Sequence, residues 1–333
     1  MPDARSKQKP AGAEQRLDHA SVGCARARSH RCEPEVLRGT NFIEAMVDQE
    51  RGFFEDEGLL LDLRGGQGGG PVIQALVGSS LEIGRTGPLT LIPAIVNQGI
   101  GLVNTATVQH LSPFEIASLP EYPILTPEEM EGRTIGVVSA DGGTENILDL
   151  MLTGAGVPLE PVSRPAVGVG FAPYELARSG EVDAWVGQTT ARALIEREQG
   201  IDLPYVNPDE FIELPSSSYV IPSGAAAPDG DVAVRFFAGS LRGHEFLMDE
   251  SGHEQAVEDL QVYNPDIDME PTLFELPLLM ESWSFGGDDR LLELDEARWQ
   301  GASDGLVVAG FIDREASVDE LTDPTHLDVV KGR

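Results

Sequence analysis

Three polar, glycine-bearing loops that run directly into predicted helices are the segments of this chain best suited to hold a small molecule. They span residues 65–71, 84–88 and 139–144. Glycine lets a ligand approach the backbone, and the first turn of a helix offers N–H groups that no helical carbonyl satisfies. None of the loops contains the Gly-Lys-Ser/Thr sequence of a nucleotide-binding P-loop. For loop 65–71, a flexible connection without a ligand is the alternative.

Arg85 is the only basic residue in these three loops. A guanidinium can pair with a carboxylate, sulfonate or phosphate, although a structural role within an acidic body is the favoured alternative. Phe171 and Tyr174 are aromatic residues able to stack on a flat ligand, and Trp185 suits a core as well as a binding site. The candidate ligand contacts are Asn41, Gly68, Gly69, Arg85, Thr86, Gln109, Asp141, Gly142, Gly143, Thr144, Phe171, Tyr174, Trp185, Gln188 and Tyr219.

No arrangement typical of covalent or metal catalysis is found in the sequence. There is no Gly-x-Ser-x-Gly motif and no histidine-rich cluster. Cys24 and Cys32 have the spacing of neither a metal site nor a disulfide framework. His110 lies between apolar runs, where a structural histidine is favoured over a ligand donor. We therefore predict a binding protein without catalytic residues, metal or cofactor.

The stretch from residue 131 to 190 must position several of these candidates. It predicts a strand at 134–138, the loop 139–144 and a helix at 145–152, followed later by a short helix ending at Gly180 and a strand at 182–186. Alternating strands and helices favour a parallel α/β unit, in which ligands bind outside the carboxyl ends of the strands. The stretch therefore predicts half of a binding cleft.

The remaining elements predict an α/β protein with two discontinuous lobes. The chain leaves the first lobe near residue 110 and returns near 220, so two segments form a hinge with the site between the lobes. We expect a disordered head at 1–38, lobe 1 at 39–110 and 222–333, and lobe 2 at 111–221. Further predicted strands are 59–63, 81–83, 100–108 and 203–206, and further helices are 40–54, 72–77, 89–97, 191–199, 233–248, 254–262, 273–280 and 296–309.

The chain is strongly acidic. Its 333 residues include 23 Lys and Arg against 56 Asp and Glu, a net charge of −33. This charge excludes a nucleic-acid-binding surface as the main function. The only lysines are Lys7, Lys9 and Lys331. Such a surface suits a high-salt environment, and a GC-rich genome that favours arginine codons explains it equally well.

An ordered set of motifs resembles the NMT1/THI5-like, SsuA-type substrate-binding proteins of ABC transporters, which have the type II periplasmic binding protein fold. The resemblance covers roughly residues 40–328, with Arg133 where lysine is usual. The motifs are QERGFFEDEGL at 49–59, the glycine-bearing loop 65–71, QHLSPF at 109–114, LTPEEMEGRTIGV at 125–137, GEVDA at 180–184, and DEARWQ at 295–300 followed by AGFI at 309–312.

This resemblance implies a solute-binding component of an ABC importer. It would be a monomer that captures a small polar or heterocyclic molecule by hinge closure and delivers it to an ABC permease. It implies an extracytoplasmic location, although residues 1–38 show neither a signal peptide nor the family's first strand. Pyrimidine precursors, riboflavin-like compounds, sulfonates, nitrate and bicarbonate are the ligand candidates.

A non-transport ligand sensor and a dehydratase-like enzyme on the same fold are the alternatives. Related pyrimidine synthases use a pyridoxal-phosphate lysine and a cysteine-rich iron site. Here no lysine lies between residues 10 and 330 and no cysteine follows Cys32, which argues against that chemistry.

Overall fold

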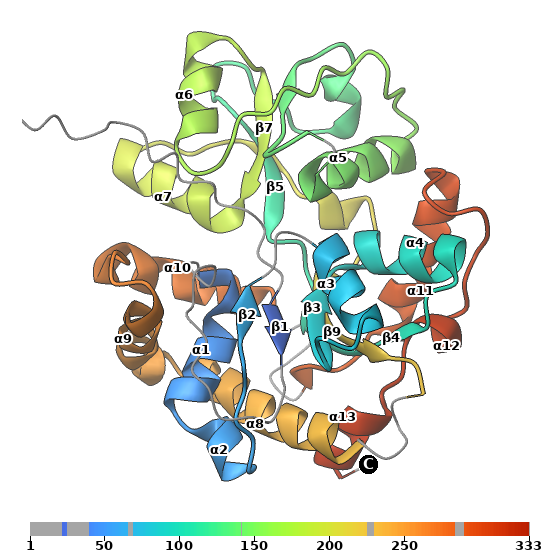
Figure 1. The fold of residues 1–333 in the computed structure, drawn as a ribbon. Coiled ribbons are helices and arrows are strands. Elements are labelled where there is room, and N and C mark those ends of the chain that lie inside the picture. The colour runs from blue at the N-terminus through green and yellow to red at the C-terminus, as the bar shows by residue number, and fades with distance from the viewer. Residues whose placement is uncertain are drawn as a thin grey trace, which may run out of the picture.

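A computed structural model describes residues 22–24, 40–65, 69–140, 142–224, 230–283 and 290–332. The molecule consists of two lobes, each built around its own β-sheet, so the predicted two-lobed α/β fold is confirmed (Figure 1). We define lobe 1 by the sheet with strand order β2-β1-β3-β9-β4 and lobe 2 by the sheet with order β6-β7-β5-β8.

The sheet of lobe 1 combines strands from distant parts of the chain. Strand β9 pairs antiparallel with both β3 and β4, so β3 and β4 run parallel to each other. All four residues of β3 and all eight of β4 are buried, as expected for strands covered on both faces. The strands are β1 (Val22–Cys24), β2 (Arg64–Gly65), β3 (Ile83–Thr86), β4 (Leu102–Gln109) and β9 (Ser217–Pro222).

Helices cover both faces of this sheet, and the sheet separates two apolar cores. One core joins the sheet to α1, α8, α9 and α10, and the other joins it to α3, α4 and α11. Among the described residues, no helix is long and apolar enough to cross a membrane. The helices of lobe 1 are η1 (Thr40–Phe42), α1 (Ile43–Glu50), α2 (Phe53–Asp56), α3 (Gly69–Val77), α4 (Pro88–Gln98), α8 (Gly230–Met248), η4 (Glu250–Gly252), α9 (His253–Tyr263), α10 (Met269–Glu281), α11 (Glu296–Val308), α12 (Val318–Leu321) and α13 (Thr325–Val330).

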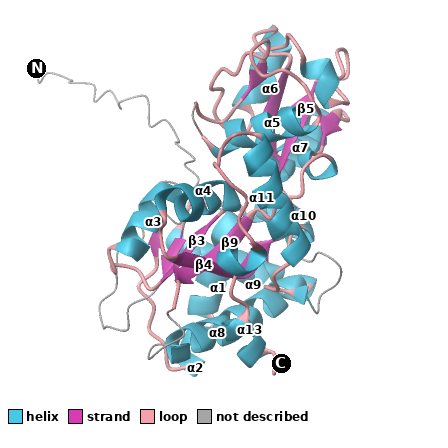
Figure 2. Ribbon diagram, turned by 90° about the vertical axis from the view of Figure 1, so that its right-hand side faces the viewer, coloured by secondary structure: helices cyan, strands magenta, loops and turns pink. Residues whose placement is uncertain are grey.

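Lobe 2 has the same layered construction on a smaller scale. Strand β7 pairs parallel with β6 and antiparallel with β5, and β5 pairs antiparallel with β8. Helix α5 lies against one face of the sheet, and α6 and α7 lie against the other (Figures 1 and 2). The elements are β5 (Phe114–Ser118), η2 (Pro127–Met130), β6 (Ile135–Gly136), α5 (Gly143–Gly154), α6 (Ala172–Ser179), β7 (Ala184–Gln188), α7 (Thr189–Gln199), β8 (Tyr205–Val206) and η3 (Pro208–Glu210).

Several predictions from the sequence require correction. Residues 59–63 form no strand, because the ladder to β1 begins only at Arg64. The helix predicted over 40–54 is interrupted at Gly52, which adopts a left-handed φ of 73° between α1 and α2. The parallel arrangement expected for residues 131–190 is confirmed for β6 and β7, and β5, which precedes that stretch, runs antiparallel to β7.

The lobe boundaries also differ from the prediction. Strand β9 lies wholly in the sheet of lobe 1, so the chain returns there at residue 217 and not at 222. The segment 22–24 forms strand β1 within the predicted disordered head, and it supplies a first strand paired with β2 and β3. The remaining head residues, 1–21 and 25–38, lie outside the described residues.

Asp48 of α1 is fully buried inside lobe 1, with the side chain of Ser240 as its hydrogen-bonding neighbour. Burial raises the pKa of this carboxyl well above its usual range, and the adjacent Glu44 raises it further. The folded state therefore holds a proton that the unfolded chain releases above pH 3.8. Proton binding by Asp48 therefore contributes its full stabilisation of the folded state below that pH. This stabilisation is lost as the pH rises through the pKa of Asp48 in the folded state.

We expect the Asp48→Asn variant to gain stability relative to the wild type as the pH rises. Asparagine matches the shape of the protonated carboxyl but does not titrate. The substitution therefore removes a pH dependence of the free energy of unfolding of about 1.4 kcal/mol per pH unit. Buried His244, whose pKa is lowered to about 3, gives the free energy of unfolding a pH dependence of opposite sign. This contribution is the same in the wild type and the variant, so the difference between their stabilities reports on Asp48 alone. Urea unfolding at several pH values measures this difference, and a constant difference would contradict the prediction.

Candidate functional site

The ends of the strands from the two sheets meet where the chain passes between the lobes. Strand β4 ends at Gln109 and β5 begins at Phe114, so four residues form the first crossover. The register pairs Gln109 with Ser217 and Phe114 with Gln188, which places the ends of β9 and β7 at the same edges. We call these facing strand ends, with the helix N-termini that follow them, the interlobe edge.

Four helices begin at this edge because each follows a strand that ends there. Helix α3 follows β2, α4 follows β3, α5 follows β6, and α7 follows β7. The orientation results from the topology, since β2, β3 and β4 run in one direction. The predicted loops at helix N-termini therefore converge on one region. Such N-termini present N–H groups to polar molecules.

On the side of lobe 1, Arg85 is 2% exposed and is held by surrounding acceptors. Its Nη1 forms a buried ion pair with Glu44 and also donates to the carbonyl of Asn41 at 2.9 Å. Its Nε donates to the Ser217 hydroxyl at 2.7 Å, and its Nη2 lies 3.4 Å from Gln109 Oε1. These contacts support a structural role for Arg85, which the sequence analysis favoured over a contact with an anionic ligand.

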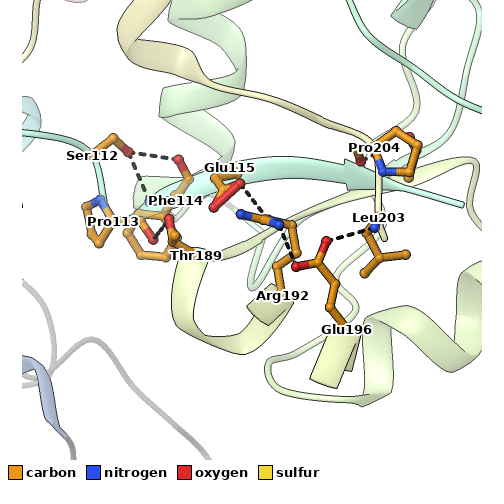
Figure 3. A network of polar contacts seen from close by, with 10 residues as sticks. Ser112, Pro113, Phe114, Glu115, Thr189, Arg192, Glu196, Leu203 and Pro204 are labelled. Atoms are coloured by element: carbon orange, nitrogen blue, oxygen red, sulfur yellow. Dashed lines mark hydrogen bonds and ion pairs between the residues drawn. The ribbon is translucent and has the colours of Figure 1, made fainter. Parts of the chain in front are cut away.

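On the side of lobe 2, Arg192 of α7 joins two carboxylates (Figure 3). Its Nε donates to Glu115 Oε2 at 2.8 Å, and its Nη1 donates to Glu196 Oε2 at 2.8 Å. Glu196 also accepts the backbone N–H of Leu203 at 2.8 Å. The network fixes the first turns of α7 against β5 and against the residues leading to β8. Two negative charges meet one positive charge here.

Asp209 ties the two crossover segments together. Its Oδ2 accepts the backbone N–H of Ser112 in the first crossover at 2.7 Å. Its Oδ1 accepts from Arg298 of α11 at 2.6 Å, and Arg298 also donates to the carbonyl of Leu214 in the second crossover. Both segments are therefore anchored to lobe 1 at one point. A second contact between the lobes pairs Arg197 of α7 with Glu270 of α10.

The candidate residues fall into three groups. Gly68 and Asp141 lie outside the described residues. The residues at the interlobe edge are Gly69, Arg85, Thr86, Gln109, Gly142, Gly143, Thr144 and Gln188, and Asn41 lies beside them because its carbonyl accepts from Arg85. The aromatic candidates lie elsewhere, as Tyr174, Trp185 and Tyr219 are at most 5% exposed in the two cores and Phe171 is half-buried beside Tyr174.

The stacking prediction for Tyr174 therefore needs a correction, and for Trp185 the core alternative is the one that the structure shows. Tyr174 and Trp185 contact each other edge to face, and the ring of Tyr219 packs against Phe236 and Phe237. A ring enclosed in this way offers no free face to a flat ligand. Thr144 is also engaged within its own lobe, because its hydroxyl accepts the backbone N–H of Val138 at 3.1 Å.

The residues that sequence reasoning missed are the acidic ones at the edge. Glu44 and Glu115 are 0% and 5% exposed, and each has one carboxylate oxygen without a hydrogen-bond partner among the described residues. A signal was available for Glu115, since it interrupts the apolar run of a short strand. No comparable pattern distinguishes Glu44, because only the tertiary fold brings Arg85 to it.

Comparison with known proteins identifies relatives by sequence profile and by fold. The profile of the family described as NMT1/THI5 like matches residues 39–252. Among proteins with curated descriptions, none matches the chain in sequence.

Solved structures of both binding proteins and an enzyme have a similar fold. The periplasmic aliphatic sulphonate binding protein SsuA from Escherichia coli matches with a TM-score of 0.62 and 14% identity, covering 84% of this chain and 88% of its own. The periplasmic nitrate-binding protein NrtA from Synechocystis matches with a TM-score of 0.61 and 12% identity, covering 90% of both chains. A cysteine-to-serine mutant of the desulfurization enzyme DszB, in complex with biphenyl-2-sulfinic acid, matches with a TM-score of 0.58 and 13% identity, covering 87% of this chain and 96% of its own.

Proposed function

Because this chain belongs to the NMT1/THI5-like family and has the periplasmic binding protein fold, we propose that it is the solute-binding component of an ABC importer. The observation that carries the proposal is the interlobe edge, where helix N-termini from two lobes meet beside two short crossovers. Partly buried polar groups between two bodies that can close on each other suit a small polar molecule.

The mechanism is capture by hinge closure. The residues proposed to contact the solute are Gly69, Thr86 and Gln109 of lobe 1 and Gly143 and Gln188 of lobe 2. The crossovers 110–113 and 207–216 absorb the rotation, with Asp209 as their common anchor. A solute shifts the balance toward the closed form only by contacts that it makes better there. The protein then acts as a monomer outside the cytoplasm and presents the closed form to a permease.

Thermal-shift measurements test the binding role. A solute present at about 100 times its Kd stabilises the folded state by about 2.7 kcal/mol. We expect a shift from at least one small polar or heterocyclic solute, with compaction of the protein in small-angle scattering. Binding without compaction would contradict closure, and no binding across the candidate solutes would contradict the function.

An enzyme is the second candidate, because DszB has the same fold. Among the described residues, no group of three or more His, Cys, Asp or Glu is arranged to hold a metal ion. Recovery of the bound solute after long incubation separates the two functions. A binding protein returns it unchanged, whereas turnover would establish the enzyme.

A further inference from the structure

Outside the crossovers, two pairs of helices bring the lobes into contact. Helix α5 of lobe 2 packs against α11 of lobe 1, and α7 of lobe 2 packs against α10 of lobe 1. In Figure 1 the first contact lies to the right of the crossovers and the second lies to the left. The two contacts differ in chemistry, and this difference indicates which of them opens more readily.

The contact between α5 and α11 is apolar and adjoins the second crossover. Leu150 of α5 is 4% exposed and belongs to the same apolar core as Trp299 and Leu306 of α11. Arg298 of α11 also holds Asp209 of that crossover. Separating α5 from α11 would expose apolar side chains to water, a cost that salt does not screen. We therefore expect this side to stay joined when the lobes move.

The contact between α7 and α10 depends on one arginine. Arg197 of α7 forms an ion pair with Glu270 of α10, and its guanidinium carbon lies 4.8 Å from the centre of the Phe274 ring, one turn further along α10. The side chains of Arg197 and Glu270 are 43% and 73% exposed. Phe274 is half-buried and belongs to neither apolar core of lobe 1. This contact is therefore electrostatic, and salt screens it.

Helix α10 and helix α7 both border the interlobe edge. Glu275 of α10 accepts a hydrogen bond from the Thr40 hydroxyl at 3.2 Å, and Thr40 precedes Asn41 beside the edge. Helix α7 begins at Thr189, directly after Gln188 of the edge. Release of α7 from α10 would therefore widen the interlobe edge on this side.

Both lobes are strongly acidic, so they repel each other. Residues 111–216 of lobe 2 contain 5 Lys or Arg against 18 Asp or Glu, and residues 40–110 and 217–333 of lobe 1 contain 10 against 33. Arg197 pairs with a carboxylate of the other lobe. The other four arginines of lobe 2 pair with carboxylates of their own lobe, and these are Arg133, Arg164, Arg178 and Arg192. Arg197 thus supplies an attraction between two bodies whose net charges repel.

We propose that Arg197 is a latch between the lobes: its contacts with Glu270 and Phe274 hold α7 against α10, and loss of these contacts lets the acidic lobes separate on that side. The movement occurs about the crossovers and the contact between α5 and α11. An exposed ion pair and an exposed cation–π contact together change the ratio of held to released molecules about fivefold. For the proposed solute-binding function, the apparent affinity would follow that ratio.

The distance between two spin labels measures the latch in the full-length protein without any solute. The labels are attached at Gln199→Cys, at the end of α7, and at Val262→Cys in α9, which packs against α10. Both positions are exposed, and Cys24 and Cys32 are replaced by serine in every protein.

We expect the protein that retains Arg197 to give mainly the shorter distance at about 0.01 M salt, where the Debye length is about 30 Å. Arg197→Met should raise the ratio of longer to shorter distances about fivefold, because it removes both contacts. Arg197→Glu should raise this ratio further, since it adds repulsion with Glu270. In Arg197→Glu, about 1 M salt should lower the ratio again, because a Debye length of about 3 Å screens the repulsion.

Two matched variants separate a latch from a general effect of charge. Arg178→Glu makes the same charge change at an exposed arginine of lobe 2, but this arginine pairs with Glu175 of its own lobe. It should leave the distances nearly unchanged. Arg197→Glu combined with Glu270→Arg restores an ion pair between the lobes, so it should restore the shorter distance.

Circular dichroism should show every variant folded, because the substituted side chains are exposed. Wild-type distances in Arg197→Glu at low salt would overturn the latch, and so would equal opening by Arg178→Glu. Failure of the exchanged pair to restore the shorter distance would overturn the role of Glu270. These results would leave the solute-binding function standing, because the measurement uses no solute, whereas that function fails only if no solute binds.

Discussion

The Gly243→Ala variant is expected to lose about 3 kcal/mol of folding stability, enough to lower the unfolding midpoint in urea substantially. Gly243 lies in α8, where a Cβ atom would stand 1.3 Å from Asp48 Oδ1 and 2.5 Å from its Cγ. Asp48 cannot rotate into solvent because it is fully buried. Helix α1 would have to move away from α8, and the packing of the larger core would be lost with it.

Gly305→Ala on α11 is the matched control, because a Cβ atom there meets nothing within 4 Å. This variant should gain about 0.5–1 kcal/mol from the lower conformational freedom of the unfolded chain. The double variant Asp48→Ala with Gly243→Ala should recover part of the loss, since the first change removes the obstructing carboxyl. Similar stabilities of the two single alanine variants would contradict the predicted overlap.

The Arg85→Met variant is expected to lose about 3–5 kcal/mol, because it leaves the fully buried Glu44 without its counter-charge. Burial already raises the pKa of Glu44, and Arg85 opposes that effect. In the variant the pKa rises further, and the folded state holds a proton that the unfolded chain releases above pH 4.5. The deficit should therefore shrink as the pH falls toward 4.5 and grow as the pH rises.

Two further variants separate the charge effect from the loss of packing. Glu44→Gln combined with Arg85→Met should be more stable at neutral pH than Arg85→Met alone, because no unpaired charge remains buried. Arg178→Met removes an arginine from an exposed ion pair and should change stability by less than about 1 kcal/mol. If both arginine variants lost the same amount, burial of the Arg85–Glu44 pair would not be the cause.

The local elements of this protein were predictable because they depend on contacts close in sequence. Gly180 ends α6 with a left-handed φ of 79°, as its position after a helical pattern predicts. The apolar run before residue 109 forms a fully buried strand, and the loops before α4 and α5 precede helices as expected. The two-lobed organisation followed from the placement of the two crossovers. The ordered motifs pointed to the same fold.

Only the tertiary structure decided which candidate site residues are buried and which are held in ion pairs. From sequence, Arg85 could contact an anionic ligand or, as the favoured alternative, have a structural role, and Trp185 suits a core as well as a binding site. The fold decides between these alternatives, because it pairs Arg85 with Glu44, which lies 41 residues away, and encloses Trp185 beside Tyr174. Burial and ion pairing depend on segments that are distant in the chain, so no local pattern encodes them. For the same reason, the unsatisfied groups of Glu115 and Gln109 emerge only when β4 and β5 are placed around their crossover.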